Sequence, residues 1–160
     1  MRMIAAILAA ALLPLSLCGQ QTVSICGSWK SEYTESRDMY DLVLDNDFAF
    51  NADGTYSQTS DYYMEFHGKD HGNSKIRICS SGTYAVSGTT VFFTPDLGSV
   101  TSEMYETHMS GSLENIFRNI VVPKMAKRYR SSRSSEIVDL TAAQLVLLAD
   151  DGRKAVYKRL

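Results

Sequence analysis

The sequence predicts a mainly β fold, an eight-stranded antiparallel up-and-down barrel with a helical insertion over its mouth. From residue 25 onward, most of the chain alternates between apolar and polar residues with period two, which is typical of half-buried strands. Tight-turn sequences such as Asp53–Gly54 and Asp151–Gly152 separate these segments. One stretch, residues 95–134, breaks this rhythm and contains a helical pattern. Successive antiparallel strands can close into a barrel, which removes both exposed sheet edges.

Composition limits the number of domains and the class of function. A chain of 160 residues has room for one domain with one sizeable core. The formal net charge of −2 gives no global basic field, so we expect no nucleic-acid partner. The sequence contains no nucleophile elbow, HExxH, P-loop or GxGxxG motif. We therefore expect a protein that is not an enzyme and that carries no cofactor and no metal.

The N-terminus reads as a secretory signal peptide over residues 1–19, followed by the barrel domain over residues 20–160. Arg2 precedes an unbroken apolar run, Ile4–Leu13, which is too short to span a bilayer as a helix. The alternative is a lipoprotein signal in which Cys18 becomes the acylated first residue. We expect export to the periplasm or the extracellular space, with an outer-membrane lipoprotein as the alternative and membrane contact only if Cys18 is lipidated.

Turns and strand breakers set the predicted strand boundaries. Gly54 permits a tight turn, a bulge is expected at residues 80–82, and Pro95 ends a strand. The predicted barrel strands are residues 25–33, 42–50, 55–66, 75–86, 89–94, 136–140, 145–149 and 154–160. Residues 100–109 are a candidate for a further strand. The third strand has one face that is polar at one end and apolar at the other, which favours a lined cavity over a dry core.

The insertion at residues 95–134 contains the predicted helix. Apolar residues recur at helical spacing after Ser112, a plausible N-cap, and Pro123 is expected to kink or divide the helix. If strand five ends at the mouth of the barrel, the helix lies across that mouth as a lid. We expect Ile116, Phe117 and Ile120 to face the barrel. A helix packed on the barrel wall is the alternative.

Two polar clusters have a functional and a structural interpretation. The basic run Lys124–Arg133 suits an anionic head group or an acidic partner, or it is the solvated side of a helix. His67 and His71, with Asp70 between them, are residue types that bind transition metals, but no further ligand lies at a suitable spacing. They are better interpreted as a solvated loop tip. No metal site is predicted from them.

Cys26 and Cys79 remain if Cys18 leaves with the signal peptide. Export permits a disulfide between them. Two free thiols are the alternative, because Cys79 falls in the middle of a strand while Cys26 lies at the start of the first one.

Several short motifs resemble the lipocalin-like domain proteins exported by Bacteroidetes-type bacteria. They are Gly27-Ser28-Trp29-Lys30, Phe50 with Asp53-Gly54-Thr55-Tyr56, Ser81-Gly82-Thr83-Tyr84, Ile137-Val138-Asp139-Leu140-Thr141 with Leu145-Val146-Leu147, and Tyr157-Lys158-Arg159-Leu160. In that family a first-strand tryptophan packs under an arginine from near the end of the barrel. The resemblance therefore implies that Trp29 and Arg159 form this pair, and closure of the first strand on the last brings the same two residues together.

We expect the protein to bind a small apolar or amphipathic molecule. The alternative is an envelope structural or protein-interaction module with a filled barrel. The inward aromatic set serves as ligand lining in the first interpretation and as plain core in the second. Predicted lining and lid residues are Phe48, Phe50, Tyr62, Met64, Phe66, Tyr84, Phe93, Ile116, Phe117 and Ile120.

Overall fold

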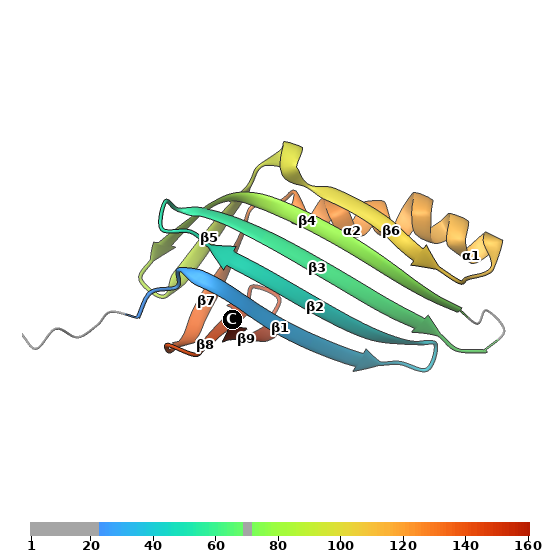
Figure 1. The fold of residues 1–160 in the computed structure, drawn as a ribbon, viewed down its shortest axis with the longest axis horizontal. Helices are drawn as coiled ribbons and strands as arrows, with labels where there is room; N and C mark the ends of the chain where they lie inside the picture. Colours follow the sequence, from blue (N-terminus) through green and yellow to red (C-terminus); the bar gives the residue numbers. More distant parts are fainter. Residues whose placement is uncertain (1–22, 69–71) are drawn as a thin grey trace, which may run out of the picture.

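The computed structural model describes residues 23–68 and 72–160 (Figure 1). The predicted signal peptide and Cys18 lie outside these residues. The strands are β1 (Gly27–Ser36), β2 (Tyr40–Phe50), β3 (Thr55–Phe66), β4 (Gly72–Ser87), β5 (Thr90–Pro95), β6 (Thr101–Thr107), β7 (Arg133–Leu140), β8 (Gln144–Ala149) and β9 (Lys154–Arg159). Between β5 and β7 lie the 3-10 turn η2 (Leu97–Ser99), the helix α1 (Gly111–Ile116), the π-helical turn η3 (Phe117–Val121) and the helix α2 (Val122–Tyr129).

Eight of the strands close into an antiparallel barrel, as predicted. Around the barrel the order is β1-β2-β3-β4-β5-β7-β8-β9, and β9 returns to pair with β1. Each strand therefore pairs with its neighbour in the chain, except that β6 and the helices intervene between β5 and β7. The sixth strand pairs with β4 outside the closed circuit, in the region 100–109 that the sequence marked as a candidate strand.

The long strand β4 exchanges one partner for another along the same edge. Its first half pairs with β6 up to Cys79, and its second half pairs with β5 from Gly82 onward. The predicted bulge at residues 80–82 is wrong, because the register between β3 and β4 is unbroken through this region. Glycine is required at position 82 for a different reason. A Cβ there would collide with the backbone of Thr94 and Pro95, where β5 ends against β4.

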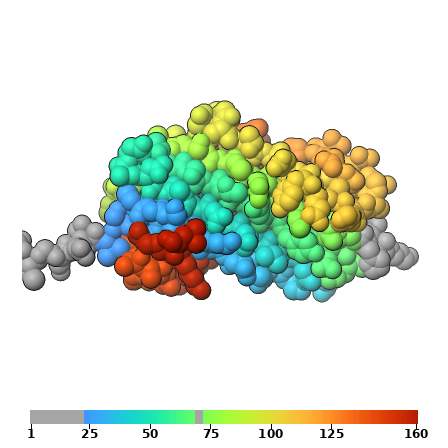
Figure 2. Space-filling model, viewed as in Figure 1, coloured from blue at the N-terminus to red at the C-terminus, as the bar shows by residue number. Residues whose placement is uncertain are grey.

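Two apolar clusters fill the two halves of the molecule. We call the half of the barrel in which β1 pairs with β9 the closed half. It contains the floor core, which consists of Ile25, Trp29, Phe48, Phe50, Tyr56, Val91, Phe93, Leu145, Leu147 and Tyr157. The helix core lies under the helices and consists of Ile76, Ile78, Met104, Phe117 and Val122, with half-buried neighbours such as Tyr62, Met64 and Phe66. In Figure 2, β9 in red lies toward the end where the chain enters, and β6 and α1 in yellow to orange lie at the other end.

The helical segment covers the inner face of the long strands beyond the closed half, so the predicted helix over the mouth is confirmed. It divides at the π-helical turn just before Pro123, close to where proline was expected to break it. Its predicted orientation is partly wrong. Phe117 is buried, but Ile116 and Ile120 are each 49% exposed.

The π-helical turn explains the exposure of Ile120. A π turn inserts an extra residue into the helical repeat and rotates everything that follows. After Phe117, Val121 and Val122 are the next residues that face the sheet. Regular α-helical spacing would place Ile120 and Val121 there instead. None of the helices in the described part of the chain is both long and apolar enough to cross a membrane.

Candidate functional site

A layer of polar side chains crosses the barrel between the floor core and the helix core, and we call it the waist layer. Its members are Ser31, Asn46, Gln58, Ser60, Ser80, Arg133 and Tyr157. They follow by period-two alternation from the inward residues of the floor core, such as Trp29, Phe48 and Tyr56. Gln58, Ser60 and Ser80 are buried at 6%, 0% and 3% exposure. Such deeply buried polar side chains are uncommon, and they are normally hydrogen-bonded.

Asn46 is the centre of a hydrogen-bond network in the waist layer. Its Oδ1 accepts hydrogen bonds from Gln58 Nε2 at 2.9 Å and from Ser60 Oγ at 2.6 Å. Its Nδ2 donates to the hydroxyl oxygen of Tyr157 at 3.0 Å. Burial raises the pKa of Tyr157, so that phenol is neutral at physiological pH. The network ties β2, β3 and β9 together across the interior with neutral groups alone.

Arg133 brings a positive charge into this neutral layer. It is the first residue of β7, where period-two alternation places it on the inner face two residues before the buried Ser135. Its Nη2 donates a hydrogen bond to Gln58 Oε1 at 2.6 Å. Its guanidinium carbon lies 4.9 Å from the ring centre of Phe93, in the floor core, and 5.9 Å from that of Tyr129, on α2. The side chain is half-buried, and no carboxylate of residues 23–68 or 72–160 forms an ion pair with it.

Two buried hydroxyls in or next to the waist layer lack hydrogen-bond partners within the described residues. One is Ser80 Oγ in the waist layer, directly opposite Gln58 in the register of β3 and β4. The other is Tyr56 Oη in the floor core. A buried hydroxyl without a partner loses its hydration without compensation, at a typical cost of about 1–3 kcal/mol. The interior therefore offers more hydrogen-bonding capacity than its own side chains use.

Tyr62 and Tyr129 link the waist layer to the helix. Their hydroxyl oxygens are 2.6 Å apart, joining β3 to the last residue of α2. Burial raises the pKa of Tyr62, and the contact with Tyr129 raises it further. The Tyr62 phenol is therefore neutral across the physiological range and is able to donate or accept a hydrogen bond.

Next to the waist layer, the inner face of β1 and β2 is only partly covered. In the described part of the chain, β9 pairs with β1 only through Trp29 and Lys30, so the rest of β1 extends beyond the closed half. Tyr33 on this extension is 50% exposed, and Leu42 and Leu44 are half-buried. By alternation all three lie on the same face as Phe48. We call these three residues the apolar strip, and it runs outward from Asn46.

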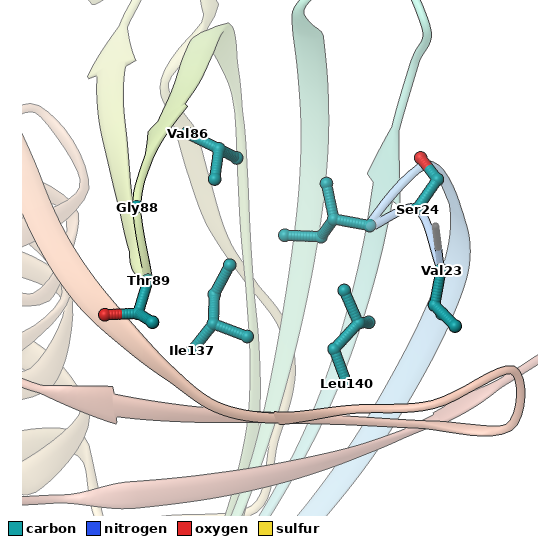
Figure 3. A pocket seen from close by; sticks show the side chains of 8 residues that line it. Val23, Ser24, Val86, Gly88, Thr89, Ile137 and Leu140 are labelled. Atoms are coloured by element: carbon teal, nitrogen blue, oxygen red, sulfur yellow. The ribbon is translucent and has the colours of Figure 1, made fainter. Parts of the chain in front are cut away.

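A separate depression of about 380 Å³ lies near the opposite end of the barrel (Figure 3). Its lining residues are Val23, Ser24, Ile25, Val86, Gly88, Thr89, Ile137 and Leu140. This lining is apolar apart from two hydroxyls and contains no titratable side chain. It therefore offers no charged group to a ligand, and the sequence reasoning did not identify it.

The predicted lining residues do not form one surface. Phe48, Phe50 and Phe93 are packed together in the floor core, where the rings of Phe48 and Phe50 stack with centroids 5.1 Å apart. Tyr84 packs edge-on to Phe50 at the same end. The remaining predicted lining residues, Tyr62, Met64, Phe66 and Phe117, belong to the helix core. Ile116 and Ile120 belong to neither core, and each is 49% exposed.

Cys26 and Cys79 are both free thiols, so the disulfide alternative is wrong for this structure. Cys26 Sγ lies 3.3 Å from the hydroxyl of Tyr84 at the floor, whereas Cys79 faces Thr59 across the pair of β3 and β4. Hydrogen bonds with Ser24 and Tyr84 lower the pKa of the Cys26 thiol.

The predicted contact between Trp29 and Arg159 is confirmed. The Arg159 guanidinium carbon lies 4.3 Å from the centre of the Trp29 ring system, and the two residues are paired across β1 and β9. Gly27 makes room for this guanidinium, because a Cβ there would press on Arg159 Nη1.

The structure separates the members of the predicted basic run. Lys124, Lys127, Arg128 and Arg130 are exposed on α2 and at its end, whereas Arg133 has entered the barrel. His67 Nε2 lies 3.1 Å from Asp41 Oδ2. Asp70 and His71 lie outside the described residues.

Sequence reasoning missed the network around Asn46 and the interior position of Arg133. One signal was available, since Gln58 and Ser60 were recognised as polar residues on an inward face. The position of Arg133 was obscured because β7 begins at residue 133, three residues before the predicted strand.

Comparison with known proteins found similarity among solved structures only. No family model and no curated protein matches the chain. Among solved structures, the chain is similar to an uncharacterized protein from Bacteroides eggerthii DSM 20697, at 16% identity and a TM-score of 0.43. The match covers 84% of this chain and 98% of the other.

Proposed function

We propose that the protein is an exported, non-enzymatic, lipocalin-like barrel that binds a small amphipathic molecule at the waist layer. The observation that carries the proposal is the junction of the apolar strip with the polar waist layer at Asn46. Small-molecule sites are typically apolar surfaces with a few convergent polar groups. Export is supported by the leader-like sequence of residues 1–19.

The floor half is unsuited to hold the ligand. Trp29, Phe50, Tyr56 and Phe93 are each at most 2% exposed, and their rings already pack against one another or their neighbours. Interiors packed in this way have few voids larger than a water molecule. The ligand is therefore placed on the helix side of the waist layer.

There the two ends of an amphipathic molecule find different surroundings. Its apolar part lies along Tyr33, Leu42 and Leu44, where burial by the ligand removes exposed apolar surface from water. Its polar end lies at the waist layer, where Ser80 and Arg133 have unused hydrogen-bonding capacity. The α2 helix borders this region through Tyr129 and adjusts its position when the ligand enters.

Binding measurements with a single-chain amphiphile test the proposal. The mature protein is titrated with dodecyl compounds, and complexes are counted by native mass spectrometry and isothermal calorimetry. Leu44→Gln places a polar group on the apolar strip and is expected to weaken binding at least tenfold. Val43→Gln, on the outer face of the same strand, is the matched control and leaves affinity unchanged. No binding up to the solubility limit, or equal effects of the two variants, contradicts the proposal.

A second candidate is an envelope or protein-interaction module with a filled barrel. It is favoured by the helix core, where Phe117 and Val122 are buried at 6% exposure against β3, β4 and β6. In that case the contact surface is the outer face of the helix. The double variant Lys127→Glu and Arg130→Glu then abolishes retention of an acidic protein partner. Lys154→Glu, an exposed charge change on β9, leaves retention intact.

A further inference from the structure

We infer that the polar end of the bound molecule is a carboxylate held by Arg133. The inference rests on the proposed function, since it names the chemistry of the ligand at that same site. Its basis is a charge that the interior leaves unbalanced, together with the geometry of the groups around that charge.

Arg133 combines partial burial with the lack of a carboxylate partner among the described residues. Arginine is protonated at every physiological pH, so its charge persists wherever it lies. Surface cations such as Lys75, Arg77 and Arg153 have a carboxylate within 2.9 Å. Arg133 is half-buried, and its recorded hydrogen bond within the described residues goes to the neutral amide of Gln58. A cation taken out of water without an anion is costly, and an anionic ligand offsets that cost.

The described contacts of the guanidinium use few of its donors. Its central carbon lies 4.9 Å from the ring centre of Phe93 and 5.9 Å from that of Tyr129, both within cation–π range. The Nη2 bond to Gln58 uses one of its five N–H donors. A carboxylate is the planar group that matches the remaining fork, with two parallel N–H···O bonds.

Neutral donors near the cation complete the match. The hydroxyl oxygens of Tyr62 and Tyr129 lie 2.6 Å apart, so one of the two O–H groups donates to the other and one is left to donate elsewhere. Ser80 Oγ is fully buried opposite Gln58 and lacks a partner in the described structure. The remaining tyrosine O–H and the Ser80 hydroxyl are each able to donate to a carboxylate oxygen.

The charge count favours a monoanion over a phosphate monoester. Arg133 is one cation in a layer whose other members are neutral. Arg153, which also acts on Tyr62 electrostatically, is already paired with Asp151 at 2.7 Å. A dianion brought into this layer retains uncompensated negative charge, whereas a single carboxylate is balanced.

A pair of ligands that differ only at the head group tests the inference. Dodecanoic acid and 1-dodecanol are titrated into the mature protein at pH 8, where the acid is ionised. We expect the wild type to bind the acid at least tenfold more tightly than the alcohol. Arg133→Met keeps an unbranched, flexible side chain without the charge, and it is expected to remove this preference while retaining affinity for the alcohol. Arg130→Met, an exposed charge removal nearby, keeps the preference.

The outcomes separate this inference from the proposed function. Equal affinity of the wild type for acid and alcohol overturns the carboxylate assignment and leaves the amphiphile site standing. Absence of binding by both ligands overturns both. Since Arg133→Met can perturb folding, the comparison of the two ligands on the wild-type protein decides the question by itself. Dodecyl phosphate is included as a third ligand, and tighter binding of this compound than of the acid also overturns the assignment.

Discussion

Arg159 Nη1 and Nη2 donate hydrogen bonds to the carbonyl oxygens of Cys26 and Ser24 while the guanidinium lies over the ring of Trp29. The indole Nε1 in turn donates to the carbonyl oxygen of Ile25 at 2.7 Å. One arginine from the last strand therefore fixes the chain that leads into the first strand. This relationship closes the floor of the barrel.

Trp29→Ala is expected to destabilise the protein by about 3–5 kcal/mol, because it empties a fully buried indole site and removes the surface under Arg159. Urea denaturation followed by circular dichroism measures the free energy of unfolding. Lys158→Met is the control, because Lys158 is exposed and adjacent to Arg159 in the chain. It is expected to change the free energy of unfolding by less than about 0.5 kcal/mol. Amphiphile affinity of folded Trp29→Ala should match the wild type. A loss of affinity would show that the floor contributes to binding.

Gly82→Ala is expected to destabilise the protein by more than about 2 kcal/mol, or to prevent folding, because the new methyl group collides with backbone atoms of Thr94 and Pro95. Gly111→Ala is the matched control. Nothing lies within 4 Å of a Cβ at that position, which is the first residue of α1, and alanine favours helix by up to about 1 kcal/mol relative to glycine. Thermal unfolding should therefore show opposite shifts for the two variants, and shifts of equal sign would contradict the close approach of β4 and β5.

Phe117→Ala is expected to destabilise the protein by about 3–5 kcal/mol, because Phe117 is buried in the helix core edge-on to Phe66. Ile120→Ala, at a half-exposed position in the same turn, should change stability by no more than about 1 kcal/mol. Chemical denaturation of both variants measures the difference. Comparable losses would mean that the helix has regular α-helical register and that Ile120 faces the sheet.

Stability is expected to fall at alkaline pH through buried tyrosines. Burial raises the folded-state pKa of Tyr62, and burial with the Cys26 contact raises the pKa of Tyr84 to about 12, above the usual tyrosine value of about 10. The contribution of these two neutral phenols to the free energy of unfolding is therefore fully present below about pH 10, and it declines as the pH rises above about 10. The free energy of unfolding, measured in urea from pH 8 to pH 12, should decline less steeply in Tyr62→Phe than in the wild type.

Tyr63→Phe serves as the control, since Tyr63 lies on the outer face of β3 next to Tyr62. Its pH profile is expected to follow that of the wild type. Identical profiles for Tyr62→Phe and the wild type would mean that the hydroxyl pair with Tyr129 does not form.

Much of the barrel could be predicted from the sequence because its signals are local. Period-two alternation located the eight barrel strands, and turn residues such as Gly54 and Gly152 separated neighbouring strands. The alternation also assigned inward and outward faces, since a one-residue slip would expose the whole apolar face. Closure of β1 on β9 then placed Trp29 beside Arg159.

The candidate site could be predicted only in part. Tyr62, Met64 and Phe66 were correctly placed on an inner face, but their separation from Phe48 and Phe50 by a polar layer was not foreseen. Asn46 gives no local signal, because its role depends on Gln58, Ser60 and Tyr157 arriving from two other strands. The outward orientation of Ile120 depended on a π-helical turn, which helical periodicity does not reveal.

By itself, the sequence determined the strand order, the inward faces and the residues that close the floor, because each follows from local alternation and turn chemistry. The tertiary structure decided how the interior is divided. The partner exchange of β4 at Gly82, the π-helical turn before Pro123 and the entry of Arg133 at the start of β7 are all outcomes of packing between distant segments. Such packing places one guanidinium between Phe93 and Tyr129, and no pattern along the chain specifies that position.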